Sequence, residues 1–233
     1  MSSVLVNYST VGVITASSDD ILADGIYKGI GVFLTVVCVL GQLENITSIV
    51  MFKRHKSLQT MDNVIVTGLA CSDLGQALFG LPMVVMASFF GSWVFGHNAC
   101  VAYAFWTTTL GLTQITLLTI LSIERYFVVV QNKRVLTASK QRTIVSVVFS
   151  FAYGALWASF PLIGWSSYSI EKGGIACSVA WDFTSTLFVS YWYCLIAFCW
   201  LIPLSVISIC YSRITLMVSY LLKKMMHDLY VCT

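Results

Sequence analysis

A long uncharged stretch near the middle of the chain constrains the fold more than any other feature. From Val101 to Ile123 the sequence contains no aspartate, glutamate, lysine or arginine. At about 1.5 Å of rise per residue, a helix of this length crosses the hydrocarbon core of a bilayer, which is about 30 Å thick. A cysteine precedes the stretch, and Glu124-Arg125-Tyr126 closes it where apolar sequence meets a basic loop. We therefore expect a membrane-spanning helix with a cysteine at one end and a charged triplet at the other.

The composition extends this expectation to the whole chain. Of the 233 residues, 58% are hydrophobic and 10% are charged, and the mean hydropathy is +0.85. Soluble domains carry about 25% charged residues, so this chain belongs in lipid. Three prolines leave little room for linkers, and no cleavable signal peptide is expected. The eight cysteines include no close pair of the zinc-binding kind, so we expect no metal site, and we expect no nucleic-acid partner.

Hydropathy and charge together divide the chain into five apolar segments. We predict an all-α membrane protein with helices over about 26–52, 62–90, 98–130, 143–163 and 186–222. Residues 1–25 form an N-terminal tail in this reading, and residues 223–233 form a short, atypical tail on the other side. Pro82 and Pro203 are expected to bend the second and fifth helices.

Basic residues orient the five segments. Only Lys28 and Lys172 fall on the side that carries the N-terminus. Because cytoplasmic loops hold the excess of lysine and arginine, we expect the N-terminus outside. The residues on the inner side are Lys53, Arg54, Lys56, Lys133, Arg134, Lys140, Arg142, Arg213, Lys223 and Lys224.

This orientation places two cysteines and a glycosylation sequon outside together. Asn7 opens the sequon Asn7-Tyr8-Ser9, so we expect glycosylation there if the tail is extracellular. Cys100 and Cys177 lie in outer loops, where disulfides persist, whereas the other cysteines lie in or beside apolar runs. We expect a Cys100–Cys177 bridge, with two unrelated thiols as the alternative.

Several polar groups lie at membrane depth. Asn45 and Asp73 either form a structural hydrogen bond between helices or line a hydrated switching site, since such groups are costly in lipid. Glu44 lies next to Asn45, and the sequence assigns it no role. The triplet from Glu124 to Tyr126 is either a helix end that reaches the headgroups or a switchable Glu–Arg pair.

With these residues in place, the chain resembles a rhodopsin-class G-protein-coupled receptor, and within that class an opsin. The resemblance covers about residues 25–225. The Tyr103/Glu171 pair and the sequence GSWVFG at 91–96, before Cys100, are closest to the peropsin, neuropsin and retinochrome-like branch. The resemblance implies a location in the plasma membrane or a photoreceptor membrane. The motifs that carry it are Asn45, Leu69-Ala70 with Asp73, Trp93, Phe95-Gly96, Cys100, Glu124-Arg125-Tyr126, Trp157, Pro161, Gly164-Trp165-Ser166 followed by Glu171 and Cys177, Pro203 and Tyr211.

The resemblance implies roles for individual residues. Arg125 would hold the inactive state and then engage a heterotrimeric G protein, with Tyr211 swinging towards it. Tyr103 stands where vertebrate visual opsins carry a glutamate counterion, and Glu171 matches the outer-loop counterion to a protonated Schiff base of retinal. The alternative for Glu171 is a solvated loop acid. The positions that match the retinal pocket, otherwise read as helix packing, are Thr108, Gly111, Leu112, Ile115, Leu195, Cys199 and Trp200.

The resemblance also implies a seven-helix bundle of which this chain represents the first five helices. Lys28 sits at the outer border of the first predicted span and Lys223 at the inner border of the fifth, and no lysine lies deeper inside a span, so this chain alone is expected not to attach retinal covalently. The final residues read as an alternative exon, a read-through end or a partial gene model. Besides a signalling photoreceptor, three alternatives stand: a retinal photoisomerase, a non-signalling truncated isoform that pairs with a full-length opsin, and a receptor for a soluble ligand. Apart from the photoisomerase, no enzymatic role or catalytic residue is predicted.

Overall fold

The computed structural model describes residues 18–55, 57, 60–135, 139–181 and 185–231. Within these residues, five segments are long and apolar enough to cross a membrane. They are Asp24–Arg54, Asn63–Phe90, Gly96–Gln131, Lys140–Ile163 and Thr186–Asp228. The predicted all-α architecture of five membrane-spanning helices is confirmed.

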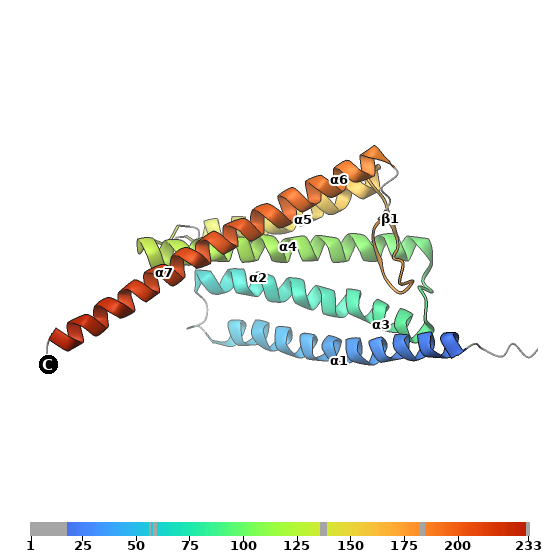
Figure 1. Cartoon of the computed structure of the whole chain (residues 1–233), viewed down its shortest axis with the longest axis horizontal. Coiled ribbons are helices and arrows are strands. Elements are labelled where there is room, and N and C mark those ends of the chain that lie inside the picture. The colour runs from blue at the N-terminus through green and yellow to red at the C-terminus, as the bar shows by residue number, and fades with distance from the viewer. Residues whose placement is uncertain (1–17, 56, 58–59, 136–138, 182–184, 232–233) are drawn as a thin grey trace, which may run out of the picture.

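The helices lie side by side in a bundle (Figure 1). The elements are α1 (Ser18–Arg54), α2 (Met61–Gly75), the π-helical turn η2 (Gln76–Gly80), α3 (Leu81–Phe90), α4 (Gly96–Gln131), α5 (Lys140–Ser159), the 3-10 turn η3 (Phe160–Ile163), β1 (Tyr168–Ile170), β2 (Cys177–Val179), α6 (Thr186–Ile196), the π-helical turn η4 (Ala197–Leu201) and α7 (Ile202–Val231). The long helix α4 contacts α2, α5 and α7, while α1 packs along α2 and α3. The first helix therefore begins inside the predicted tail, and α7 continues helically beyond residue 222 to Val231.

Local sequence explains where the helices begin and end. The hydroxyl of Thr60 caps α2 by accepting from the backbone N–H of Asn63, and Ser139 caps α5 by accepting from Arg142. Helix α3 ends at Gly91, whose φ of 69° lies in the left-handed region that glycine adopts without steric cost. Helix α4 ends at Asn132 with a φ of 51°, a conformation that asparagine tolerates better than most residues.

The second and fifth spans are each interrupted by a π-helical turn that lies just before a proline. Turn η2 precedes Pro82, which lies in the first turn of α3, where its missing N–H leaves no hydrogen bond unmade. Turn η4 precedes Pro203 in the same way. The two bends expected at these prolines therefore coincide with a change of helical winding, which the hydropathy pattern does not record.

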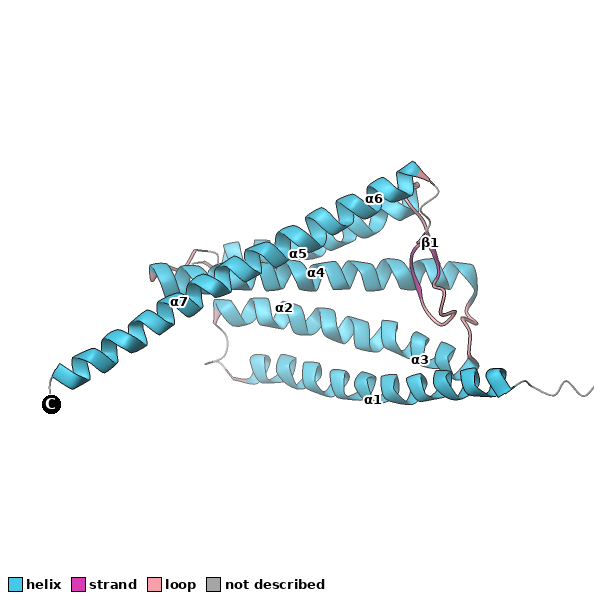
Figure 2. Cartoon of the chain, viewed as in Figure 1, coloured by secondary structure: helices cyan, strands magenta, loops and turns pink. Residues whose placement is uncertain are grey.

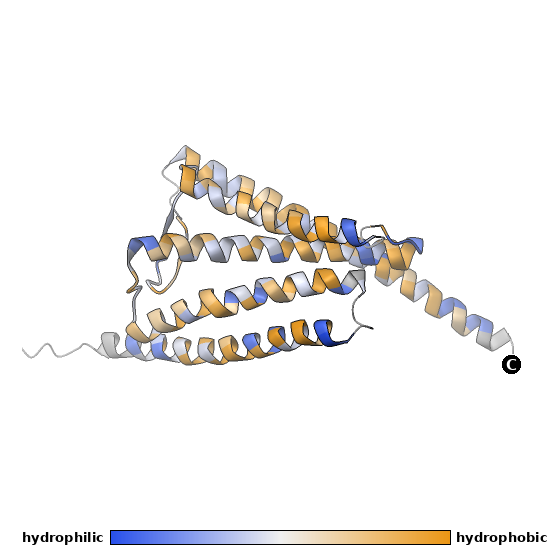
Figure 3. Cartoon of the chain, turned by 180° about the vertical axis from the view of Figure 1, so that it is seen from behind, coloured by the Kyte–Doolittle hydropathy of each residue, from blue (hydrophilic) through white to orange (hydrophobic). Residues whose placement is uncertain are grey.

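Large apolar side chains are exposed on the outside of the bundle. Figure 3 shows hydrophobic residues along the membrane-spanning helices. Phe33 is 65% exposed, Phe90 69% and Val148 61%. Such a surface would be insoluble in water, but it matches lipid chains. Helices α4 and α5 pack closely at Gly154 of α5. A Cβ added there would overlap the backbone oxygen of Thr109 on α4 and lie 2.7 Å from the hydroxyl of Thr113.

A two-stranded antiparallel hairpin lies across one end of the bundle (Figure 2). Strand β1 pairs with β2 in a register that sets Tyr168 opposite Val179 and Ile170 opposite Cys177. A disulfide joins Cys177 to Cys100 at the start of α4, with 5.5 Å between their Cα atoms. The predicted bridge is confirmed, and it ties the outer loop to the top of the third span.

Candidate functional site

Beneath the hairpin, side chains from α4, α6 and η4 gather into the main hydrophobic cluster of the bundle. Leu112 on α4, Leu195 on α6 and Cys199 on η4 are each at most 6% exposed, and Ile115 packs against them. The hairpin contributes Tyr168, Cys177 and Val179 to the same cluster. Four of the seven predicted pocket residues therefore lie in or against one cluster beneath the hairpin.

The other three predicted pocket residues are placed differently. Thr108 lies next to the hydroxyl of Tyr168, at the edge of the cluster. Gly111 faces open space, because an added Cβ would meet only Nε2 of Gln76, 3.9 Å away. Trp200 is 51% exposed and lies outside the cluster. Its assignment to the pocket stays a prediction.

Hydrogen bonds between α5 and the segment formed by α6 and η4 stabilise one side, or wall, of the hydrophobic cluster. The hydroxyl of Tyr153 donates to the backbone oxygen of Phe198 in η4 across 3.2 Å, and the thiol of Cys199 lies 3.7 Å from the same hydroxyl. The hydroxyl of Tyr191 donates to the backbone oxygen of Trp157 across 3.0 Å. Because a π-helical turn breaks the regular ladder of backbone bonds, the Tyr153 contact stabilises the part of the wall where α-helical bonding is interrupted.

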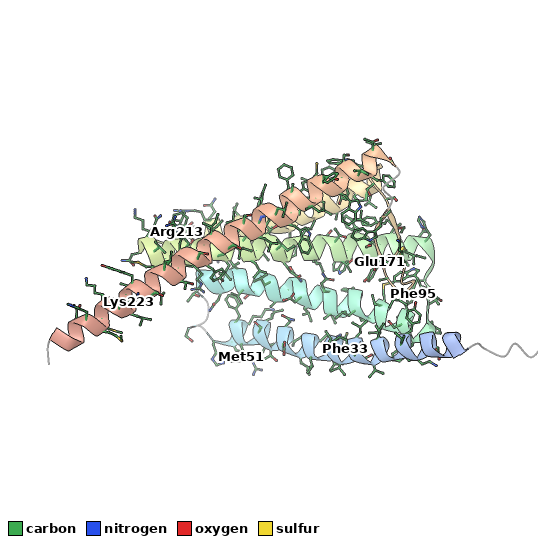
Figure 4. All side chains as sticks on the ribbon, in the orientation of Figure 1. Phe33, Met51, Phe95, Glu171, Arg213 and Lys223 are labelled. Atoms are coloured by element: carbon green, nitrogen blue, oxygen red, sulfur yellow. A yellow bond between two sulfur atoms is a disulfide. The ribbon has the colours of Figure 1, made fainter. Side chains whose placement is uncertain are left out.

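The hairpin brings Glu171 into the electrostatic neighbourhood of Tyr103. Glu171 follows β1, is exposed, and is fixed by the bond from its own N–H to the backbone oxygen of Ala176 at 2.9 Å. Its charge acts on Tyr103 of α4, whose ring lies 5.2 Å from that of Trp93. Figure 4 shows Glu171 and Phe95 at the end of the bundle that carries the hairpin. The two residues assigned to the counterion region are therefore neighbours.

A hollow of about 410 Å³ adjoins Glu171 on the outer side of the hairpin. It is lined by Glu171, Lys172, Gly173 and Trp181. The carboxylate of Glu171 therefore borders a space open to the outside, and it also interacts with a tyrosine at the top of the third span.

Tyr168 anchors the hairpin to α5. Its ring is 5% exposed, and its hydroxyl donates to the backbone oxygen of Ala158 across 2.7 Å. Burial raises the pKa of Tyr168 above its ordinary value, because the phenolate would lose its hydration. The hydroxyl therefore stays a proton donor throughout the neutral and mildly alkaline range.

At the opposite end of the bundle, Glu124 is buried whereas the adjacent Arg125 is exposed. Glu124 is 1% exposed, and its Oε2 accepts a hydrogen bond of 3.3 Å from the backbone N–H of Val135 in the inner loop. Arg142 donates to the backbone oxygen of the same residue across 2.8 Å. Arg125 instead is exposed, and Tyr211 on α7 is 51% exposed. The sequence did not indicate that Val135 and Arg142 belong to this cluster.

Asn45 and Asp73, the two polar residues predicted at membrane depth, bond to different partners. Asn45 donates to the backbone oxygen of Gly41 in its own helix across 2.8 Å. Asp73 instead accepts a hydrogen bond of 2.7 Å from Nε2 of Gln114 on α4. Gln114 was missed in the sequence, although an amide in the middle of an uncharged span is itself a signal. Glu44 lies on the exposed side of α1.

Two further expectations concern sites away from the cluster. The glycosylation sequon at Asn7 lies outside the described residues. Within the part of the chain that the structure describes, no group of three or more histidine, cysteine, aspartate or glutamate side chains is placed to hold a metal ion.

Comparison with known proteins agrees with this arrangement. The 7 transmembrane receptor (rhodopsin family) profile matches residues 44–227. The chain belongs to this family of receptors. It is 30% identical over 191 residues to the human visual pigment-like receptor peropsin, covering 82% of this chain and 57% of the relative. It is 34% identical over 191 residues to a G0-coupled rhodopsin of Mizuhopecten yessoensis, covering 81% and 47%.

The fold also matches a solved structure. The crystal structure of squid rhodopsin superposes with a TM-score of 0.79 at 28% identity, covering 89% of this chain and 60% of that chain. These similarities confirm the resemblance to opsins and identify a multi-pass membrane protein of a receptor family rather than an enzyme family. This chain spans about half the length of the relatives it matches.

Proposed function

We propose that this chain forms the first five helices of an opsin-type photoreceptor, which binds retinal and signals to a heterotrimeric G protein. The observation that carries the proposal is the open space at Gly111, under a hairpin that is tethered by a disulfide and carries Glu171. Peropsin and several rhodopsins among the relatives support the same reading.

Four of the residues that match the retinal pocket have the apolar character that an elongated chromophore would need. Leu112, Ile115, Leu195 and Cys199 offer carbon and sulfur surfaces within one cluster, and Gly111, next to Leu112, has only Nε2 of Gln76 within 4 Å of an added Cβ. Retinal would supply the light absorption and the isomerisation. The protein's own part would be to exclude water and fix the orientation of the ligand.

Glu171 would offset the positive charge that retinal acquires when it is linked to a lysine. A carboxylate near that charge favours the protonated form, and Tyr103 beside it is uncharged at neutral pH. The lysines of the described residues lie at the borders of the spans or in loops, so we infer that the linking lysine is not supplied by these five helices. Retinal bound to this chain alone is then held without a covalent bond.

The inner end would provide the surface for the G protein. Arg125 is exposed there, with Tyr211 on the neighbouring helix α7. Figure 4 shows Arg213 and Lys223 away from the hairpin end, so basic residues gather on the side opposite the disulfide. This distribution supports an extracellular N-terminus and a cytoplasmic location for Arg125.

Light-dependent nucleotide exchange tests the proposal. The chain is co-expressed with a segment that supplies the sixth and seventh helices of a receptor relative, and 11-cis-retinal is added. We expect light to stimulate exchange on a G protein and Arg125→Ala to reduce that stimulation at least tenfold, whereas Lys28→Ala, at the outer end of α1, serves as the control. Exchange that is the same in darkness and in light contradicts a signalling photoreceptor.

The same preparation separates the alternatives. A photoisomerase would convert retinal stoichiometrically under light without stimulating exchange, which chromatography of the extracted isomers detects. A non-signalling isoform would instead copurify with a full-length opsin and lower its light response.

A further inference from the structure

A crevice outside the proposed chromophore site opens between α3 and α4. It has a volume of about 340 Å³, which lies within the range of about 300–1,000 Å³ that is typical of small-molecule sites. It lies towards the hairpin end of the two helices, since Ala99 and Tyr103 come from the first turns of α4. Its lining side chains are Phe79, Met83, Ala99, Ala102, Tyr103 and Trp106.

The crevice extends from the edge of the hydrophobic cluster, against which Met83, Ala99 and Tyr103 pack, to the outer side of α4. Cys100 marks the side towards the hairpin because it is bonded to Cys177. At about 100° per residue, Ala102 and Trp106 lie about 200° and 240° around the helix from Cys100. Ala102 is exposed, and Trp106 is 39% exposed. Both helices are within membrane spans, so the surroundings of the opening are bilayer lipid.

The walls of the crevice are aromatic and fixed in orientation. Phe79 and Trp106 meet edge to face, with ring centroids 5.5 Å apart and an interplanar angle of 77°. The indole N–H of Trp106 donates to the backbone oxygen of Gly75 across 3.2 Å, at the start of the π-helical turn. That bond fixes the ring and also uses the only polar atom of the indole.

Two alanine side chains form the floor of the crevice between its aromatic walls. Ala99 and Ala102 are three residues apart on α4, so their methyl groups lie on one face and form a shallow, smooth surface. With the indole nitrogen already bonded, the hydroxyl of Tyr103 is the remaining side-chain polar group among the six lining residues.

From this combination we propose that the crevice is a binding site for a membrane sterol. A sterol has a rigid, flat, apolar ring system with one hydroxyl group, which matches fixed aromatic walls, an alanine floor and one tyrosine hydroxyl. A flexible acyl chain would lose conformational entropy on entering a rigid crevice and would leave the Tyr103 hydroxyl without a partner. The ring system lies along Ala99 and Ala102, and the sterol hydroxyl bonds to Tyr103.

Photolabelling of the whole chain in phosphatidylcholine vesicles tests the site. The probe is a photoreactive, clickable cholesterol analogue, and labelled peptides are mapped by mass spectrometry. We expect the label to concentrate on peptides that contain Phe79–Met83 and Ala99–Trp106, and a tenfold excess of cholesterol to reduce it at least fivefold. Ala102→Phe, which fills the floor, should reduce labelling at least fivefold, whereas Val148→Phe, on the exposed face of α5, should leave it unchanged.

A second variant and a second probe distinguish a sterol site from misfolding and from general lipid contact. Tyr103→Phe preserves the shape, so it should reduce labelling by about twofold to tenfold even if Ala102→Phe fails to form the Cys100–Cys177 disulfide. A phosphatidylcholine with a photoreactive acyl chain should label this crevice no more than other lipid-facing surfaces. Labelling that cholesterol does not compete, that is spread evenly over the helices, or that is matched by the acyl-chain probe would overturn the sterol site.

Discussion

Gln114 and Asp73 are joined by a hydrogen bond of 2.7 Å between two membrane-spanning helices, from Nε2 of the amide to Oδ1 of the carboxylate. Both groups are partly buried, and neither lies in a loop. A carboxylate at this depth is stabilised only if a donor reaches it, so the pair fixes α2 against α4 at the level of the bilayer interior.

Replacing Gln114 by leucine should therefore destabilise the bundle. The carboxylate of Asp73 would lose its donor, and we expect the free energy of unfolding to fall by about 1–3 kcal/mol. Thermal unfolding in nanodiscs, followed by circular dichroism, measures the effect. In a double-mutant cycle with Asp73→Asn, an interaction energy near zero would show that the bond contributes nothing.

The disulfide at the top of α4 should determine whether the hairpin stays in place. Cys100→Ser removes the tether between α4 and β2, and we expect a loss of about 2–4 kcal/mol in the free energy of unfolding. Cys71→Ser is the matched control, because Cys71 is a free, exposed cysteine. Equal melting temperatures for the two variants would contradict a structural role for the bridge.

The contact between α4 and α5 predicts a strong size limit at Gly154. An added methyl group would overlap Thr109 and press on the hydroxyl of Thr113, so Gly154→Ala should separate the helices and cost about 1–3 kcal/mol. Gly25→Ala on α1 meets no atom within 4 Å and should be neutral or slightly stabilising. The comparison uses the melting temperatures of the two variants, and a harmless change at Gly154 would refute the close packing.

Tyr168 should make the stability of the bundle depend on alkaline pH. Burial raises its pKa in the folded state above the unfolded value of about 10, so stability is constant below that pH. As pH rises above about 10, the unfolded chain loses the proton first and the folded state becomes less stable. Melting temperatures measured from pH 8 to 11 should fall more steeply for the native chain than for Tyr168→Phe. Parallel curves would mean that the hydroxyl is not buried against Ala158.

Some of these features could be predicted from the sequence because their causes are local. The uncharged run from Val101 to Ile123 requires a spanning helix whatever surrounds it, and the basic residues orient it. Cys100 and Cys177 could be paired because both fall in loops on one side of the membrane. The resemblance to opsins, rather than a local pattern, indicated Leu112 and Leu195, which the structure buries together.

Other features depend on how the helices pack, which periodicity does not encode. Asp73 was recognised as costly, but its partner lies 41 positions away on another helix. Within one π-helical turn, Trp200 falls on an exposed face although its neighbour Cys199 is buried. Glu124 accepts a hydrogen bond from the backbone of Val135, in a loop that only the folded chain brings close, so the sequence could not indicate this contact.

The visible absorption spectrum tests the central claim most directly. The chain is assembled with the sixth and seventh helices of a receptor relative, incubated with 11-cis-retinal in the dark and purified. We predict a visible absorption band that Glu171→Gln shifts or abolishes at neutral pH, while Lys172→Gln leaves it unchanged. A properly assembled, disulfide-bonded complex that shows no such band, or a band indifferent to Glu171→Gln, would contradict the account.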